Sequence, residues 1–219
     1  MELVKSDVSS YQPSIFIKFI YRMFDIIVGL CGCLVTVFLS IVVKISYIKD
    51  HDYNPIIFLQ ERIGKDGKLF KMYKFRTMVP NADEILYELM ESDEKIKQEY
   101  ETNKKLENDP RITKLGHKLR KSSLDEFPQF LNVLKGEMTL VGPRPYLVRE
   151  IKDMGDTYNT IIQCKPAITG PWQVGGRSDI DFADRCQIDV KYISEKNIKS
   201  DFKIFMKTIT SVIKREGAK

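Results

Sequence analysis

Two adjacent carboxylates, Asp125 and Glu126, are the side chains in this sequence best suited to chemistry. One interpretation of the pair is structural. Residues Ser123 to Glu126 match a capping box, and Asp125 can alternatively cap a helix that holds Pro128 in its first turn and is closed by Gly136. The other interpretation is catalytic, because a carboxylate at a helix N-terminus stays ionised and therefore nucleophilic at neutral pH. The local pattern alone favours the cap.

The residues around the pair point to phosphate chemistry. Three arginines occur near glycines and prolines that fix the backbone, namely Arg120, Arg144 in "VGPRP" and Arg177 in "GPWQVGGRSD". The planar guanidinium group suits phosphate oxygens, and a helix N-terminus stabilises phosphate as well. Mg²⁺ prefers one or two carboxylates together with substrate phosphate. Asp125 and Glu126 would then provide a nucleophile and a metal site.

Length, charge and cysteine content narrow the class of protein. The chain has 219 residues, enough for one domain with or without a small attachment, and a net charge of +5. This charge suits a phosphate-bearing partner, but a nucleic-acid binder fits poorly because basic and acidic residues are interleaved. The four cysteines show no disulfide or zinc spacing, which favours a reducing, cytosolic domain, and we expect His51 and His117 to be surface or structural residues.

An uncharged apolar run covers residues 26–43, and its 18 residues would form a helix of about 27 Å, just enough to cross a bilayer. A signal peptide is disfavoured, because the run starts late and no small-residue cleavage pattern follows. A buried core helix is the alternative, but Thr36 and Ser40 are the only polar residues in the run, so we expect a membrane segment. Basic residues flank both ends, which favours a re-entrant helix that returns to one face. Gly29 and Gly32 can help a broken helix to find backbone partners.

Turn signals and charge define the next elements. Residues 56–78 predict a β-hairpin around a Lys-Asp-Gly-Lys turn. Its basic residues form either a solvated face or a patch that attracts anionic lipid head groups. Residues 81–108 are rich in helix formers and strongly charged, and they predict one or two helices with few core contacts.

Two further helices follow from apolar spacing. Residues 112–121 predict a helix whose apolar face packs in the core. The last helix begins at Ser200 as its N-cap and serves either core packing or interfacial membrane docking. Its apolar face consists of Phe202, Phe205, Ile209 and Val212.

The order of these motifs resembles the bacterial sugar transferase family, the monotopic phosphoglycosyl transferases. The resemblance starts near "YRMFDIIVGL", runs through "FLQERIGKDGKLFKMYKFRTM", "NDPRITKLGHKLRKSSLDEFPQFLNVLKGEMTLVGPRP" and "KPAITGPWQVGGRSD", and ends in the last helix. Members transfer a sugar 1-phosphate from a UDP-sugar to polyprenyl (undecaprenyl) phosphate, with release of UMP, as the first membrane step in building a surface glycan. The resemblance implies that Asp125 forms a phosphosugar-aspartyl intermediate, while Glu126 helps to hold Mg²⁺ or assists the second substrate.

Further site residues also follow from the resemblance. Arg120, Arg144 and Arg177 fall on positions that contact phosphate or nucleotide, Lys74 on a basic position and Asp201 on an acidic one. The donor is expected to be a hexose derivative, UDP-galactose or UDP-glucose, with galactose favoured and N-acetylated sugars left open.

The resemblance also implies the architecture and the location. We expect an α+β fold, with an N-terminal re-entrant membrane helix in residues 1–50 and a compact, helix-rich catalytic domain with a small β-sheet and interfacial amphipathic helices in residues 51–219. The domain would lie on the cytoplasmic face of the bacterial inner membrane, and a homodimer is the default. Longer members carry an additional membrane bundle, so this chain is expected to be the minimal form.

One position departs from the family pattern. Family members usually break the membrane helix at a Ser-Pro pair, where this chain has Val35-Thr36, so the sequence cause of a kink is missing. We still predict re-entry. Two rival functions stay open: a non-catalytic membrane scaffold that binds nucleotide or lipid phosphate, and a hydrolase that transfers the phosphosugar to water.

Overall fold

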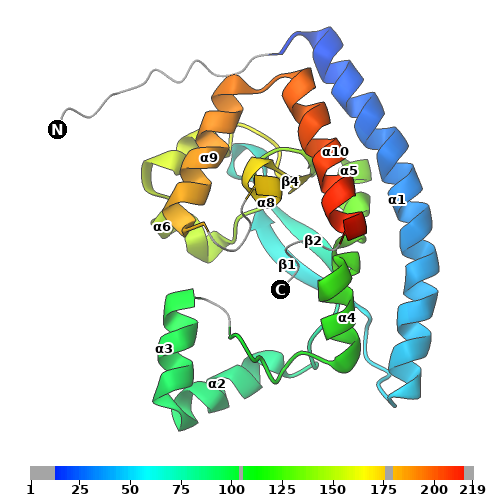
Figure 1. The fold of residues 1–219 in the computed structure, drawn as a ribbon, viewed down its shortest axis with the longest axis vertical. Coiled ribbons are helices and arrows are strands. Elements are labelled where there is room, and N and C mark those ends of the chain that lie inside the picture. Colours follow the sequence, from blue (N-terminus) through cyan, green and yellow to red (C-terminus); the bar gives the residue numbers. More distant parts are fainter. Residues whose placement is uncertain (1–12, 104–105, 176–179, 215–219) are drawn as a thin grey trace, which may run out of the picture.

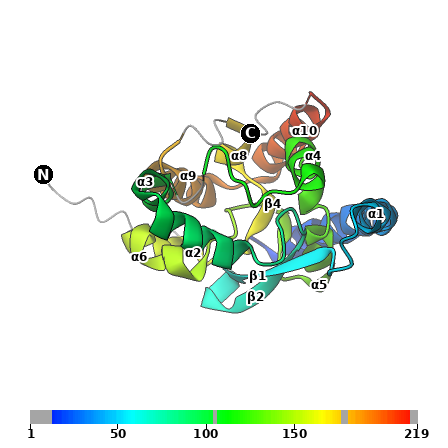
Figure 2. The ribbon, with the colours of Figure 1, turned by 90° about the horizontal axis from the view of Figure 1, so that it is seen from below.

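A computed structural model describes residues 13–103, 106–175 and 180–214. One long helix, α1 (Ile15–Lys49), lies along one side of a body that contains all other elements. Figures 1 and 2 show this helix at the edge of the molecule in both views. The sequence-based division at residue 50 into two units stays a prediction.

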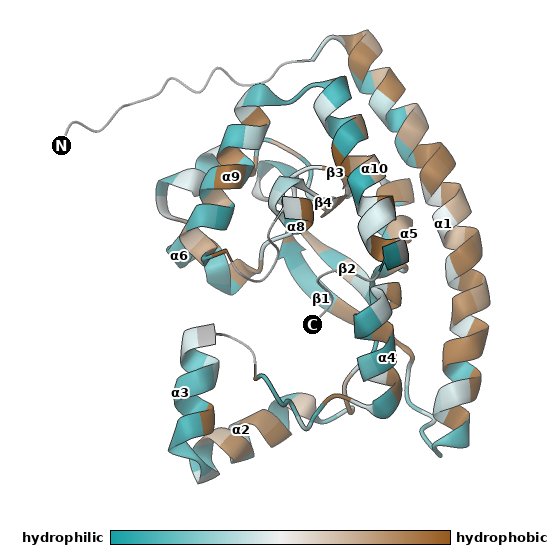
Figure 3. Cartoon of the chain, in the orientation of Figure 1, coloured by the Kyte–Doolittle hydropathy of each residue, from teal (hydrophilic) through white to brown (hydrophobic). Residues whose placement is uncertain are grey.

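Helix α1 begins at Ser14, whose hydroxyl accepts a hydrogen bond from the Ile17 N–H, and runs without interruption to Lys49. It is the single helix in the described residues that is long and apolar enough to cross a membrane. Figure 3 shows that most of its length is hydrophobic. No break occurs at Val35-Thr36, so the predicted re-entrant interruption is not present, as expected for a helix without proline.

Only a narrow seam of α1 is buried. Successive buried residues are separated by four, three, eleven and four positions, as expected for one face of a helix. The remaining surface exposes large apolar side chains, with Phe16, Leu34 and Phe38 each at least two-thirds exposed. The buried residues are Asp25, Gly29, Gly32, Val43 and Tyr47.

Strands β1 (Ile57–Ile63) and β2 (Leu69–Phe75) form the predicted antiparallel hairpin, with Ile57 opposite Phe75 and Ile63 opposite Leu69. Asp66 and Gly67 at the turn have φ values of 57° and 75°. They are the two central residues of a turn in which the Lys68 N–H donates to the Lys65 carbonyl at 3.2 Å, and two consecutive left-handed residues explain the Asp-Gly sequence.

The charged region after the hairpin forms two helices, α2 (Ala82–Ser92) and α3 (Glu94–Asn103), as predicted. They extend away from the body (Figure 1). Helix α4 (Lys114–Ser122) starts two residues later than predicted, because the Thr113 hydroxyl caps it by accepting the Gly116 N–H. Ile112 therefore precedes the helix and bridges to Met78.

The core lies between the hairpin, helix α5 (Gln129–Lys135) and a second sheet, in which β3 (Thr139–Val141) pairs in parallel with β4 (Ala167–Thr169). Short helices and turns connect these elements. They are α6 (Ile151–Met154), α7 (Tyr158–Ile161), α8 (Pro171–Gly175), and the 3₁₀ turns η1 (Lys65–Gly67), η2 (Leu124–Glu126), η3 (Val148–Glu150) and η4 (Gly155–Thr157). The fold is therefore helix-rich with two small sheets.

Helices α9 (Phe182–Glu195) and α10 (Ile198–Lys214) complete the body. Helix α10 begins before the predicted cap: the Asn197 side chain accepts the Ser200 N–H, so Ser200 lies inside the first turn. Its apolar surface is divided. Phe205 packs edge-on against Phe24 of α1 with ring centres 5.2 Å apart, whereas Phe202 is 60% exposed.

Candidate active site

Asp125 and Glu126 lie in the short 3₁₀ turn η2, between α4 and α5. We call residues 123–127 the dyad turn. Ser123 has a φ of 56° and ends α4 in the left-handed conformation. A residue in that conformation is a helix C-cap, whereas an N-cap needs extended backbone.

The predicted capping roles are therefore wrong. Neither η2 nor α5 has a side-chain cap, and α5 begins at Gln129 after Pro128. Gly136 closes α5 with a φ of 79°, as predicted. Without a capping role, both carboxylates are available for chemistry.

The apolar neighbours of the pair fix the orientation of the dyad turn. Leu124 and Phe127 pack against a cluster that contains Val43 and Tyr47 of α1, Phe75 of β2 and Leu119 of α4. Because these flanking side chains point into the cluster, the two acids between them stay partly exposed. Helix α1 thus forms part of the support for the acids.

Lys74 of β2 makes the closest charge contact with the pair, and its Nζ lies 2.8 Å from Glu126 Oε1. Burial opposes ionisation of Glu126, but the Lys74 ammonium, together with the charges of Arg144 and Arg62, outweighs this and lowers the pKa of the Glu126 carboxyl. The pKa of the neighbouring Asp125 moves in the opposite direction. Burial, together with the Glu126 charge, raises the pKa of Asp125, although Lys74 and Arg120 oppose the rise.

Arg120 is held on α4 beside the pair. Its Nε donates to Thr77 Oγ1 at 3.0 Å, and burial lowers its pKa, while the Asp125 carboxylate acts in the opposite direction. Gly116 permits this approach of α4, because a Cβ at that position would lie only 2.0 Å from the Thr77 carbonyl oxygen. The preceding Arg76 fixes the segment through its 2.7 Å ion pair with Asp52.

The loop that carries Arg144 is held by backbone contacts on both sides. The Pro143 carbonyl accepts the Ala167 N–H at 2.8 Å, and the Pro145 carbonyl accepts Arg62 at 2.9 Å. The Arg144 N–H donates to Asp189 Oδ2 at 3.2 Å. The loop therefore presents its arginine from a fixed backbone.

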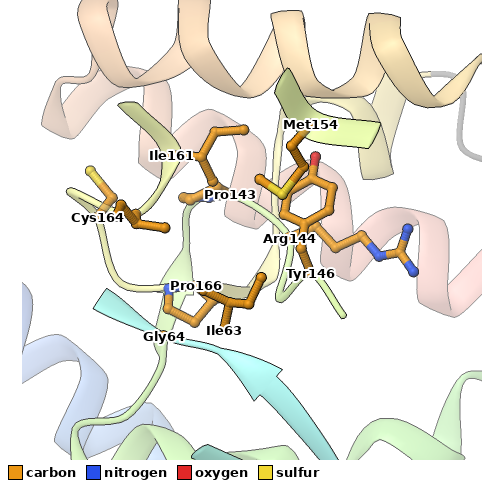
Figure 4. A pocket seen from close by; sticks show the side chains of 10 residues that line it. Ile63, Gly64, Pro143, Arg144, Tyr146, Met154, Ile161, Cys164 and Pro166 are labelled. Atoms are coloured by element: carbon orange, nitrogen blue, oxygen red, sulfur yellow. The ribbon is translucent and has the colours of Figure 1, made fainter. Parts of the chain in front are cut away.

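The Arg144 guanidinium acts on the dyad at longer range. It lies 3.8 Å from the Glu150 carboxylate, and its charge helps to lower the pKa of Glu126. Behind the loop is a small hollow lined mainly by apolar side chains, among them Ile63, Met154 and Ile161. In Figure 4 the Arg144 side chain extends away from this hollow. The apolar lining makes the hollow unsuitable for phosphate.

The sequence analysis did not single out Arg62 and Asp189 as site residues. Arg62 is 6% exposed, and burial and the nearby Arg144 charge lower its pKa to about 10. Its position could have been found from strand alternation, which puts Arg62 and Lys74 on the same face of the hairpin. Asp189 is fully buried in α9, where burial raises its pKa to about 6, and no sequence signal marks it.

Asp201 and Arg177 are the other two predicted site residues. Asp201 is buried at the start of α10, where it accepts the Tyr192 hydroxyl at 2.7 Å and pairs with Lys196 at 3.6 Å. These contacts join the start of α10 to the end of α9, and the predicted substrate contact of Asp201 stays a prediction. Arg177 lies outside the described residues. Lys74, Arg120 and Arg144 are thus the predicted cations that the structure gathers around the dyad.

The acids at the site also offer ligand atoms for Mg²⁺. Within the described part of the chain, no three His, Cys, Asp or Glu side chains converge as a metal site. The dyad offers two adjacent carboxylates, and only one oxygen of Glu126 is engaged by Lys74. Two carboxylates suffice for Mg²⁺ when phosphate and water complete its shell. The residues fit a cation that arrives with a phosphate substrate.

Comparisons with known proteins match nearly the whole chain. A family model described as bacterial sugar transferase matches residues 16–215. The undecaprenyl-phosphate galactose phosphotransferase of Salmonella typhimurium is 42% identical over 202 residues, which cover 92% of this chain and 42% of that protein. The UDP-galactose-lipid carrier transferase of Erwinia amylovora is 40% identical over 201 residues, with the same coverage.

A shorter relative matches over most of its own length. The exopolysaccharide production protein ExoY of Sinorhizobium fredii is 36% identical over 197 residues, which cover 90% of this chain and 87% of ExoY. The chain therefore spans less than half of the Salmonella and Erwinia relatives but nearly all of this one.

Proposed function

Because this chain belongs to the bacterial sugar transferase family, we propose that it transfers a sugar 1-phosphate from a UDP-sugar to polyprenyl (undecaprenyl) phosphate and releases UMP. One observation carries the proposal. An adjacent acid pair, free of any capping role, lies between Lys74, Arg120 and Arg144 on a turn that packs against a membrane-type helix. This arrangement suits phosphate transfer between a soluble donor and a lipid acceptor.

The first step is attack by Asp125 on the donor phosphate that bears the sugar. A bond forms between an Asp125 carboxylate oxygen and phosphorus, and the bond from phosphorus to the UMP oxygen breaks. UMP takes the electron pair. The surrounding cations stabilise the charge that shifts onto the transferring and leaving oxygens, which is the main catalytic contribution in phosphoryl transfer.

In the second step a phosphate oxygen of the lipid attacks the same phosphorus. The bond between phosphorus and Asp125 breaks, so the carboxylate is restored and the product is a polyprenyl diphosphate sugar. The raised pKa of Asp125 supports its assignment as nucleophile, since a more basic oxygen is the better attacking group. It also distinguishes Asp125 from Glu126, which Lys74 keeps ionised.

Glu126, together with Asp125, is proposed to hold Mg²⁺ alongside the donor phosphates. When bound, the cation neutralises phosphate charge that the arginines leave uncompensated. Lys74 orients the Glu126 carboxylate for this role through its 2.8 Å contact.

The proposed sugar is a hexose, with galactose preferred over glucose. The names of the Salmonella and Erwinia relatives, both of which contain galactose, support this preference. The proposed product would begin a surface polysaccharide, as the name of the ExoY relative suggests for that protein. The homodimer predicted from the sequence stays a prediction.

The proposed location is the cytoplasmic face of the bacterial inner membrane, with both ends of α1 on that face. A helix of 35 residues is about 52 Å long, well beyond the hydrocarbon core. Near one end, Arg22 donates to the Val133 and Leu134 carbonyls at 2.7 and 2.6 Å. Near the other, Tyr47 donates to the Arg76 carbonyl at 2.6 Å. A straight crossing would draw the charged body into the bilayer, which supports a helix embedded from one side.

Intact-mass analysis tests the covalent step. The protein is mixed with Mg²⁺ and a panel of UDP-hexoses and UDP-N-acetylhexosamines without lipid, and the reaction is quenched. We expect a hexose-phosphate adduct, which disappears when polyprenyl phosphate is added before the quench. UMP release with lipid but no adduct without it would overturn the aspartyl intermediate.

Labelled sugar separates the transferase from its rivals. Label in the organic-extractable lipid supports transfer. Label as free sugar phosphate in buffer would indicate a hydrolase, and donor binding without UMP release would indicate a scaffold.

A further inference from the structure

Helix α1 contacts the dyad turn directly through the side chain of Thr36. The Thr36 hydroxyl lies 2.8 Å from the Gly32 carbonyl of its own helix and 3.0 Å from the Phe127 carbonyl. Phe127 follows Glu126 in the chain. Thr36, in the middle of the apolar run, is thus hydrogen-bonded to the backbone carbonyl of the residue that directly follows the carboxylate pair.

The close packing of α1 against α5 makes this contact possible. A Cβ at Gly32 would lie only 2.2 Å from the Phe130 ring, and one at Gly29 would lie 2.8 Å from Leu134. The Phe130 ring in turn packs edge-on against Phe127 at 5.5 Å. The two glycines therefore bring the Phe127 carbonyl within reach of the Thr36 hydroxyl.

The contact adds a second hydrogen bond at the end of the dyad turn. The Phe127 carbonyl also accepts the Phe130 N–H at 3.0 Å, so a bond from α5 and a bond from α1 fix the same peptide. The surroundings are apolar, being formed by Leu39, Leu124 and Phe127, and a hydrogen bond is stronger at low dielectric than in water. Ser40 provides a contrast, since its hydroxyl donates only to the Thr36 carbonyl at 2.8 Å within α1.

We propose that Thr36 is a positioning residue, whose hydroxyl holds the dyad turn in register with the membrane helix. Its effect on catalysis rests on the proposed function of Asp125. Its effect on the position of the turn does not depend on that function. The positioning role of Thr36 and the proposed function of Asp125 can therefore be tested separately. Phosphoryl transfer depends mainly on positioning, so a small displacement of the turn lowers the rate of the chemical step.

Three variants isolate the contact. Thr36→Val keeps the shape and the apolar character but removes the hydroxyl, Thr36→Ser keeps the hydroxyl, and Ser40→Ala removes a hydroxyl that bonds only within α1. Hydrogen exchange is measured on the full-length protein in nanodiscs, over peptides that span residues 123–131. We expect faster exchange there in Thr36→Val alone, with the other two variants like the wild type.

UMP release from UDP-galactose with polyprenyl phosphate gives the catalytic readout. Thr36→Val is expected to lower kcat about fivefold, the scale of one lost buried hydrogen bond, with KM for the donor and the melting temperature nearly unchanged. Thr36→Ser should restore kcat. Equal effects of Thr36→Val and Ser40→Ala on exchange and kcat would overturn the proposal.

Failure of the proposed function has a different signature. In that case the wild type would release no UMP, while the exchange difference between Thr36→Val and Ser40→Ala would persist. An unchanged exchange pattern in Thr36→Val, with normal UMP release, would instead overturn the positioning role alone.

Discussion

Asp125 and Glu126 are neighbours in the chain but lie in opposite electrostatic environments. Lys74 is bonded to Glu126 and lowers its pKa, whereas burial and the Glu126 charge raise the pKa of Asp125. Pairs of acids with pKa values moved apart are typical of sites in which the two groups have different roles. The difference supports Asp125 as the nucleophile and Glu126 as the fixed anion.

The first prediction concerns Asp125→Asn. The amide cannot attack phosphorus, so we expect UMP release to fall at least about a thousandfold, on the scale seen when a covalent nucleophile is removed. The melting temperature should change little, because the Asp125 side chain is not a helix cap. Asp153→Asn, which changes an exposed aspartate, is the control and should behave like the wild type. Near-normal turnover of Asp125→Asn would refute the nucleophile assignment.

The second prediction concerns pH. The ionised form of Asp125 is the nucleophile, and its raised pKa means that this form is lost at a higher pH on acidification than for an ordinary aspartate. Lys74→Met removes the ammonium that lowers the pKa of both acids, so the acidic limb of kcat/KM should move to higher pH. Lys71→Met, at an exposed position of the same strand, is the matched control. A similar displacement in both variants would count against this electrostatic account.

At the scale of elements, α1 is a scaffold as well as a membrane segment. Asp25 accepts hydrogen bonds from Thr139 Oγ1 and from the Leu140 N–H, both at 3.0 Å, and thereby joins α1 to β3. Gly29 and Gly32 join it to α5, and Tyr47 joins it to the segment after β2. The seam therefore connects α1 to the elements that flank the dyad.

The third prediction tests this seam. Alanine is a better helix former than glycine by about 1 kcal/mol, so Gly→Ala would stabilise α1 if the helix were unpacked. At Gly32 the new Cβ meets the Phe130 ring at 2.2 Å, and we expect net destabilisation of about 1–3 kcal/mol, seen as a lower melting temperature in nanodiscs. Gly29→Ala should cost less, because the tip of Leu134 can move.

Leu34→Ala provides a control for the seam, since that side chain is 74% exposed. Its melting temperature should stay close to that of the wild type. A higher melting temperature in Gly32→Ala would show that α1 and α5 are not in close contact.

At the scale of the whole molecule, the apolar surfaces extend over two helices. Helix α1 exposes apolar side chains along its length, and α10 adds Phe202, Met206 and Ile209 at four- and three-residue steps. Phe24 and Phe205 join the two helices. The exposed residues on α10 favour interfacial docking over the alternative of core packing, and support a body that sits on a membrane.

The fourth prediction concerns topology. Lys18 and Lys49 are exposed near opposite ends of α1, and we expect Lys18→Cys and Lys49→Cys to react with a membrane-impermeant maleimide from the cytoplasmic side only. Inverted vesicles should label at both positions, and intact spheroplasts at neither. The unmodified chain measures the background from its four native cysteines. Labelling of the two positions from opposite sides would show that α1 crosses the membrane.

The sequence by itself determined the features that depend on neighbouring residues. A Lys-Asp-Gly-Lys turn signal identified the hairpin, the apolar run identified α1, and Gly136 marked the end of α5. The motif order also identified the family. Such signals are local, because helix periodicity and turn conformation are properties of a few consecutive residues.

Only the tertiary structure decided how distant residues share the site. Lys74 lies 52 residues from Glu126 along the chain, and Asp189 lies 45 residues from Arg144, yet these contacts set the charge of one acid and the position of one arginine. The capping interpretation failed because Ser123 ends α4 in the left-handed conformation, and the pairing of Asp201 with Tyr192 and Lys196 could not be seen in the sequence. Burial and electrostatic fields arise from the packed whole, so no local pattern specifies them.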